Sequence, residues 1–120
     1  MTRAVGILGI GHYVPEKTVT NFDMEKIVDT SDQWITERTG IKQRHFAAPE
    51  EATSDMSVIA AQRAMEDAGV KPEEIQLVIV GTASSDHAFP STACLVQDRL
   101  GCKNAAAFDL SAGCSGFVYN

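Results

Sequence analysis

The sequence predicts an α/β fold, in which short apolar strands alternate with amphipathic helices. Three apolar runs, residues 4–10, 75–81 and 105–110, have the continuous hydrophobic character of strands that are buried on both faces. Helical patterns over residues 56–68 and 92–100 stand between these runs, and a glycine follows each of them. This alternation indicates βαβ units and a parallel sheet.

Capping residues and helix stops define the remaining elements. Asn21 is expected to cap a short helix over residues 22–28, and a second helix is expected to begin near Ser31 or Asp32 and to end at Gly40. The helix over residues 56–68 has candidate caps in residues 53–55. Its alanine-rich stripe, which consists of Ile59, Ala60, Ala64 and Ala68, implies close packing. Residues 42–51 and 84–90 are expected to be loops.

Composition limits the size and the partners of the molecule. The chain has 120 residues, of which 44% are hydrophobic and 22% charged, and this predicts at most one compact unit. Ten Lys and Arg against 16 Asp and Glu give a net charge of −6, which argues against binding to nucleic acid or to an anionic membrane. No apolar run reaches the roughly 18 residues that span a bilayer, so we expect a soluble, cytoplasmic protein without a targeting segment.

Cysteine and histidine spacing argues against structural metals and disulfides. The three cysteines, Cys94, Cys102 and Cys114, form no C-x-x-C pair, so reduced thiols are expected. The three histidines lie far apart in the sequence without the spacing of a metal site. We therefore expect no metal site and no bound cofactor.

Cys114 is the candidate nucleophile. It lies in the small-residue run Ser111-Ala112-Gly113-Cys114-Ser115-Gly116, directly after an expected strand, where a tight turn into a helix is predicted. A thiol at the start of a helix feels the positive end of the helix dipole, and nearby backbone N–H groups can hold an oxyanion. The residues alone favour a merely buried cysteine, which is the interpretation we keep for Cys94 and Cys102.

A second candidate site lies around the only tryptophan of the chain. Trp34 and Arg38 are four residues apart and share a helix face, so they could sandwich a flat heteroaromatic ring. Lys42 and Arg44 could add positive charge for phosphates. The alternative is that Trp34 anchors a core and the charges line a solvated face.

Two other motifs are weaker. Residues 9–14 begin like a dinucleotide-binding loop, but the third glycine of G-x-G-x-x-G is absent and Pro15 follows too soon for a helix. Phe89 lies in a predicted loop and is compatible with a pocket wall or a subunit contact. The G-x-S-x-G serine elbow is excluded, because Phe117 occupies the place of its last glycine.

Three motifs together resemble one enzyme family. TSDQWITERTGI, HAFPSTAC and AAAFDLSAGCSGF, in this order and spacing, closely resemble β-ketoacyl-acyl-carrier-protein synthase III, the initiating condensing enzyme of bacterial fatty-acid synthesis. The resemblance covers essentially all 120 residues. It implies a thiolase-like layered fold (α-β-α-β-α in the full enzyme), a homodimer, and residues 1–120 as the N-terminal part of the first thiolase-like half.

The resemblance also assigns roles to individual residues. It matches Cys114 to the nucleophile that accepts an acyl group from acyl-CoA, and Thr30, Trp34 and Arg38 to residues that hold the adenine end of CoA. It matches Phe89 to a loop aromatic that reaches the acyl pocket of the partner subunit. The implied acyltransferase acylates Cys114 from acetyl-CoA or another short acyl-CoA. Malonyl-acyl-carrier protein is then decarboxylated, and its carbanion attacks the thioester.

The family's histidine and asparagine, which promote decarboxylation, are expected downstream of Asn120, and His12, His45 and His87 do not match them. The 120-residue chain alone is therefore expected to be inactive, as a truncated product or as part of a longer chain. A noncatalytic CoA-binding or dimerising module and, more remotely, a dinucleotide-binding domain are the alternatives. Thiolases and hydroxymethylglutaryl-CoA synthases share the fold and the cysteine, but TSDQWITERTGI and HAFPS favour the starter enzyme. The preferred starter acyl group is left open.

Overall fold

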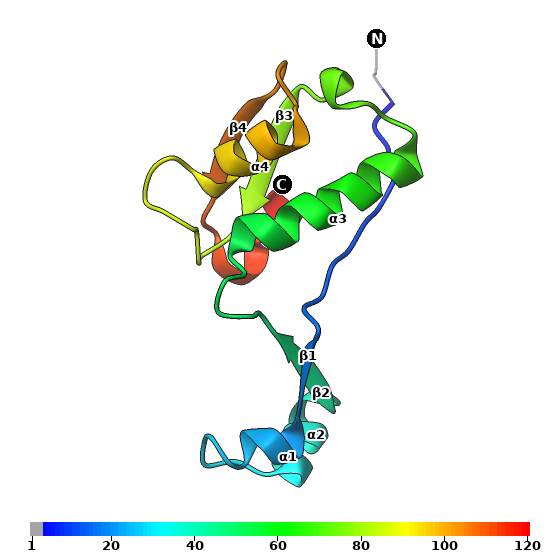
Figure 1. Cartoon of the computed structure of the whole chain (residues 1–120). Coiled ribbons are helices and arrows are strands. Elements are labelled where there is room, and N and C mark those ends of the chain that lie inside the picture. The colour runs from blue at the N-terminus through cyan, green and yellow to red at the C-terminus, as the bar shows by residue number, and fades with distance from the viewer. Residues whose placement is uncertain (1–3) are drawn as a thin grey trace. The chain divides into compact units, whose positions relative to one another are not determined.

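A parallel two-stranded sheet and two helices form the larger part of the structure, a computed structural model that describes residues 4–120 (Figure 1). Its contacts divide the chain into two units rather than the single unit expected from length. The first unit contains the described residues up to Tyr13 and Ala52–Asn120. The second is Val14–Glu51, whose ends are held by an antiparallel strand pair of its own.

The first unit is built on one βαβ motif. Strands β3 (Leu77–Gly81) and β4 (Ala106–Leu110) pair in parallel, from Leu77 opposite Ala106 to Gly81 opposite Leu110. Helix α4 (Thr92–Leu100) connects them and packs against both. Gly101 ends α4 with a φ of 74°, a left-handed conformation that glycine adopts without strain. The predicted α/β class is therefore confirmed, as are the helix over 92–100 and the two later strands.

Helix α3 (Thr53–Ala68) packs against α4 and begins earlier than predicted (Figure 1). The expected caps at residues 53–55 lie inside the helix, so this prediction was wrong. Ala52 precedes the helix, and its N–H donates to the carboxylate of Asp55 at 2.8 Å. Gly69 ends the helix with a φ of 65°, as predicted.

The strand predicted over residues 4–10 is not formed. A strand requires a backbone partner, and no strand among the described residues pairs with this segment. It runs beside α3 instead, with Val5, Ile7, Leu8 and Ile10 between 75% and 96% exposed (Figure 1). A Cβ on Gly9 or Gly11 would collide with backbone atoms of α3, so these glycines permit close approach to the helix. The alanine-rich stripe of α3 is therefore closely packed, as predicted.

The second unit contains one pair of strands and two short helices. Strands β1 (Lys17–Thr20) and β2 (Gln43–Phe46) are antiparallel. Helices α1 (Asn21–Met24) and α2 (Asp32–Thr39) lie between them in the sequence. The prediction of a loop over 42–51 was wrong at β2, because its polar sequence acquires strand geometry only through pairing with β1. Helix α2 was predicted correctly, with Ser31 as its cap and Gly40 as its stop.

The cap of α1 is Thr20 and not Asn21, which corrects the sequence prediction. The Thr20 hydroxyl accepts from the N–H of Asp23 at 3.2 Å, and the Asp23 carboxylate accepts from the Thr20 N–H at 3.0 Å. This reciprocal pair is a capping box. Asn21 is instead 1% exposed and forms hydrogen bonds inside the second unit. The helix is also shorter than predicted and ends at Met24.

Few apolar side chains are buried among the described residues, and hydrogen bonds at helix ends satisfy buried backbone groups. The buried apolar residues are Val19, Val58, Ala93, Val96 and Cys102. Asp109 on β4 accepts from the N–H of Thr92 at 2.8 Å and from that of Ala93 at 2.7 Å. Thr92 and Ala93 are both 0% exposed. This carboxylate therefore satisfies two buried donors at the start of α4, where a negative charge is favourable.

We expect Asp109→Ala to lower the free energy of unfolding by about 1–3 kcal/mol, because two buried N–H groups lose their acceptor. Urea denaturation followed by circular dichroism measures the change. Asp98→Ala, which removes an exposed carboxylate from α4 itself, should change stability by less than about 0.5 kcal/mol. Equal effects of the two substitutions would contradict the role of Asp109.

The capping box of α1 predicts a pH dependence. The Thr20 hydroxyl, the Thr20 N–H and Lys26 donate to Asp23 and lower its pKa to about 2. A carboxyl with a depressed pKa stabilises the fold above its unfolded pKa of about 3.9 and loses this contribution as the pH falls through the folded value. The stability difference between the native protein and Asp23→Ala should therefore be constant above about pH 5 and shrink toward pH 2. A difference that stays constant down to pH 2.5 in urea titrations would contradict this assignment.

Candidate functional site

Cys114 occupies a tight turn between a strand and a helix, as predicted. Strand β4 ends at Leu110, a 3₁₀ turn follows at Gly113–Ser115, and helix α5 (Gly116–Tyr119) follows directly. Gly113 has a φ of 52°, which lets the chain reverse at this point without strain. The α-helix starts two residues after Cys114, which therefore lies in the turn itself.

The backbone of this turn is stabilised by its own hydrogen bonds and by contact with the end of β3. The N–H of Ser115 donates to the carbonyl of Ala112 at 3.1 Å, and the N–H of Gly116 donates to the carbonyl of Gly113. Gly116 is buried and lies against Gly81 at the end of β3. The absence of side chains at both positions brings the turn onto the carboxyl end of the strand.

The three cysteines differ in accessibility. Cys114 is exposed, Cys94 is half-buried and accepts a hydrogen bond from the Ser91 hydroxyl at 3.2 Å, and Cys102 is 1% exposed. Burial, followed by the nearby charge of Glu73, raises the pKa of the Cys102 thiol. Of the three thiols, Cys114 is thus the one open to a substrate.

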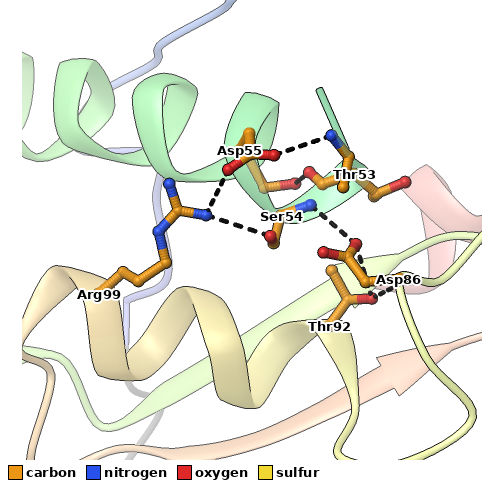
Figure 2. Close-up of polar contacts among 8 residues, drawn as sticks. Thr53, Ser54, Asp55, Asp86, Thr92 and Arg99 are labelled. Carbon is orange, nitrogen blue, oxygen red and sulfur yellow. Dashed lines mark hydrogen bonds and ion pairs between the residues drawn. The ribbon is translucent and has the colours of Figure 1, made fainter. Parts of the chain in front are cut away.

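The loop that carries Phe89 is fixed at its base and exposed at its tip. Figure 2 shows Asp86 between two helix starts: one of its carboxylate oxygens accepts from the N–H of Ser54 at 2.9 Å, and its own N–H donates to the Thr92 hydroxyl at 3.0 Å. The Thr53 hydroxyl donates to the carbonyl of Ser84 at 2.6 Å. Phe89 itself is 90% exposed. The predicted loop is therefore anchored by hydrogen bonds near its ends and exposes an aromatic side chain at its tip.

The same cluster continues through Arg99 of α4 (Figure 2). Its guanidinium donates to the Asp55 carboxylate at 2.7 Å and to the Ser54 hydroxyl at 3.1 Å. The hydrogen bond from the Ala52 N–H, and then the one from Arg99, lower the pKa of Asp55. Sequence reasoning assigned residues 53–55 to caps and missed this cluster, because its partner Asp86 lies about thirty residues away and no local pattern marks it.

Thr30 and Trp34 line one pocket of the second unit. Asp29, Thr30, Ser31 and Trp34 surround it. The hydroxyl of Ser31 accepts from the N–H of Trp34 at 3.1 Å, which caps α2 and fixes the first turn beneath the pocket. Trp34 is 54% exposed, so it is not the core anchor that the alternative interpretation required.

Arg38 stacks directly on Trp34. Its guanidinium carbon lies 5.0 Å from the centroid of the indole ring, a cation–π distance. A ring between the two would need two van der Waals separations of roughly 3.5 Å each, about 7 Å in total. The predicted sandwich therefore requires Arg38 to move away from its present position.

Lys42 and Arg44, the predicted positive patch, form hydrogen bonds within the second unit. Arg44 donates to the side-chain oxygen of Asn21 at 2.7 Å and to the carbonyl of Val19 at 3.2 Å. Lys42 donates to the Thr36 hydroxyl at 3.1 Å. His45 contacts the carbonyl of Pro15 at 2.6 Å. Arg44 in particular links β2 to Val19 and Asn21, so it is a structural residue here.

The candidate residues are divided between the two units. Thr30, Trp34 and Arg38 belong to the second unit, and Cys114 and Phe89 to the first. In the described part of the chain, no group of three or more His, Cys, Asp or Glu side chains suits a metal ion. Within residues 4–120, no helix combines the length and the apolar character that crossing a bilayer requires.

The dinucleotide-binding alternative finds no support in the geometry. From residue 4 onward no strand precedes residues 9–14, and Gly9 and Gly11 lie against the backbone of α3. A dinucleotide-binding loop needs its glycines between a strand and the start of a helix, where the pyrophosphate lies.

Comparisons with known proteins agree on one enzyme family, although no family model matches the chain. The chain is 62% identical over 116 residues to a β-ketoacyl-[acyl-carrier-protein] synthase III of Caldanaerobacter subterraneus subsp. tengcongensis, and 59% identical over 117 residues to that of Clostridium acetobutylicum. These matches cover 97% and 98% of this chain but 35% and 36% of the relatives. The chain thus spans about a third of the length of the curated relatives it matches.

Solved structures give the same result. The 3-oxoacyl-[acyl-carrier-protein] synthase III of Aquifex aeolicus matches 94% of this chain with a TM-score of 0.89 and 54% identity, over 36% of its own length. The priming β-ketosynthase of the R1128 polyketide pathway matches 94% with a TM-score of 0.90 and 42% identity, over 34% of its own length. The thiolase-like fold expected from the sequence motifs is thereby confirmed. Over about a third of their length, the chain is similar in sequence and fold to β-ketoacyl-[acyl-carrier-protein] synthase III enzymes.

Proposed function

We propose that the protein carrying this chain joins a short acyl-CoA to malonyl-acyl-carrier protein with loss of carbon dioxide, and that Cys114 is its nucleophile. The observation that carries the proposal is the exposed Cys114 in a strand–turn–helix elbow, in a chain similar to these enzymes. The product is a β-ketoacyl-carrier protein, and the reaction is the first elongation step of fatty-acid synthesis.

The first half-reaction is acyl transfer to sulfur. The Cys114 thiolate attacks the thioester carbonyl of acyl-CoA, a new carbon–sulfur bond forms, and the bond to the CoA sulfur breaks. The departing CoA thiolate takes up a proton from solvent. The N–H groups of Ser115 and Gly116 already donate within the turn, so the N–H of Cys114 is the donor we assign to the developing oxyanion.

The nucleotide end of CoA is assigned to the second unit. The pocket lined by Thr30 and Trp34 offers an exposed indole face for adenine, and Thr30 offers a hydroxyl beside it. Arg38 supplies a cation that can move from the indole toward the bound nucleotide. No bound metal or organic cofactor is required by this scheme.

The second half-reaction uses malonyl-acyl-carrier protein. Loss of carbon dioxide leaves a carbanion, which attacks the Cys114 thioester, forms the new carbon–carbon bond and expels the Cys114 thiolate. We assign no residue of this chain to decarboxylation. Phe89, at the exposed tip of its loop, is assigned to the acyl pocket of a partner subunit in a cytoplasmic homodimer.

Acylation of Cys114 is tested by the intact mass of the native protein before and after incubation with acetyl-CoA. We expect one acetyl adduct that is lost in Cys114→Ser and kept in the matched control Cys94→Ser, whose thiol is half-buried. An adduct that survives Cys114→Ser would contradict the assignment. CoA binding without any adduct on the folded native protein would instead favour the noncatalytic CoA-binding module.

Stacking of adenine on Trp34 is tested by calorimetric titration with CoA. Stacking of a base on an aromatic ring contributes about 1–3 kcal/mol, so Trp34→Ala should raise the Kd for CoA roughly 5- to 150-fold. Pantetheine, which lacks the nucleotide, should bind the variant and the native protein alike. An unchanged Kd for CoA in Trp34→Ala would overturn this part of the proposal.

A further inference from the structure

Helix α2 carries Trp34 and Arg38, yet it has no buried residue. Helices of globular proteins are ordinarily oriented by an apolar face that packs against a core. Because α2 has no fully buried residue, hydrogen bonds contribute strongly to its position. The source of those bonds therefore decides where the indole and the guanidinium point.

The side chain of Asn21 supplies them from the first residue of α1. Its amide nitrogen donates to the Asp32 carboxylate and to the carbonyl of Ile41, both at 2.8 Å, and lies 3.3 Å from the Thr36 hydroxyl. These partners lie in the first turn of α2, in its middle and just beyond its end. One buried side chain thus contacts α2 at its start and in its middle, and the chain just beyond its end.

The orientation of this amide is determined by its partners. Its oxygen accepts from Arg44 at 2.7 Å, and a guanidinium can only donate. The carbonyl of Ile41 can only accept, so it must face the amide nitrogen. Arg44 also donates to Val19 of β1, and the Asn21 N–H donates to the carbonyl of Lys42 at 3.2 Å. Asn21 therefore links α2 to both strands of the second unit.

The anchored face of α2 lies opposite its ligand-binding face. Asp32 and Thr36 are one turn apart and face Asn21. Trp34 and Arg38 are also one turn apart, but they are displaced by two residues, which is about 200° around a helix of 3.6 residues per turn. The exposed indole is consistent with this placement. A change at Asn21 would therefore tilt or shift the Trp34–Arg38 face without touching a ligand.

We propose that Asn21 is a positioning residue for the nucleotide end of acyl-CoA, which it controls by fixing α2 through Asp32, Thr36 and Ile41. This inference rests on the proposed function, because it takes Trp34 and Arg38 to bind the adenine. Asn21 itself makes no contact with substrate in this scheme. Its influence is specific to substrates that carry the nucleotide.

The test uses the native protein with Asn21→Asp and Asn21→Ala. Asn21→Asp keeps the size and the contact to Arg44 but places an acceptor against the Asp32 carboxylate and the Ile41 carbonyl. The matched control is Gln33→Ala, which removes the exposed hydrogen bond from Gln33 to Glu37 on the same helix. Acylation is measured with acetyl-CoA and with S-acetyl-N-acetylcysteamine, a short acetyl thioester without a nucleotide.

We expect both Asn21 variants to raise the KM for acetyl-CoA roughly fivefold or more, with kcat changed less than about twofold. Acylation by the short thioester, and both reactions of Gln33→Ala, should stay at native levels. Equal losses of acylation with both substrates would show that Asn21 affects folding in general, and this would overturn the proposal. Unchanged kinetics would overturn it as well. If the Asn21 variants do not fold, Thr36→Val, which removes one partner of the amide, must show the same split in a weaker form.

The outcomes separate this inference from the proposed function. If Trp34→Ala weakens CoA binding while Asn21→Asp leaves the KM unchanged, the positioning role fails and the adenine site stands. If Trp34→Ala has no effect on CoA binding, the adenine site itself fails, whatever the Asn21 variants do.

Discussion

The Asp109 carboxylate is the contact on which the geometry of the first unit depends. It binds the first two backbone N–H groups of α4, in which Thr92 and Ala93 are fully buried. Asp109 lies on β4, which leads directly into the turn that carries Cys114. Helix α4, in turn, begins where the Phe89 loop ends. One side chain therefore links the strand of the nucleophile to the base of the loop that presents the aromatic residue.

Polar anchoring recurs in the second unit. There the buried amide of Asn21 replaces the carboxylate of Asp109 and holds α2 by its two ends and its middle. In both units a polar side chain from one element satisfies groups at the end of another. Hydrogen bonds are directional, so they fix orientation more sharply than apolar contact does.

Features set by local chemistry could be predicted from the sequence. Helix ends at Gly40, Gly69 and Gly101 follow from left-handed φ angles that glycine adopts freely, and all three are observed. The elbow at Cys114 follows from small residues after an apolar strand. The proximity of Trp34 to Arg38 follows from their spacing on one helix.

Features that depend on distant partners could not be predicted. Residues 4–10 have the composition of a strand, but composition does not provide a pairing partner. Residues 43–46 lack an apolar pattern and become a strand through β1. Asn21 resembles a cap in sequence, and only the fold shows that its amide reaches Asp32 and Ile41. The roles of Asp86 and Arg44 could not be predicted either, because their partners Ser54 and Val19 lie more than twenty residues away.

We propose that Cys114 accepts the acyl group while the second unit holds the nucleotide. A crystal structure of the native protein after a short soak with acetyl-CoA would show both contacts at once. We expect an acetyl thioester on Sγ of Cys114 and the adenine of the released CoA against the indole of Trp34. An unmodified Cys114 with the acetyl group on another side chain, or CoA bound away from Trp34, would contradict it.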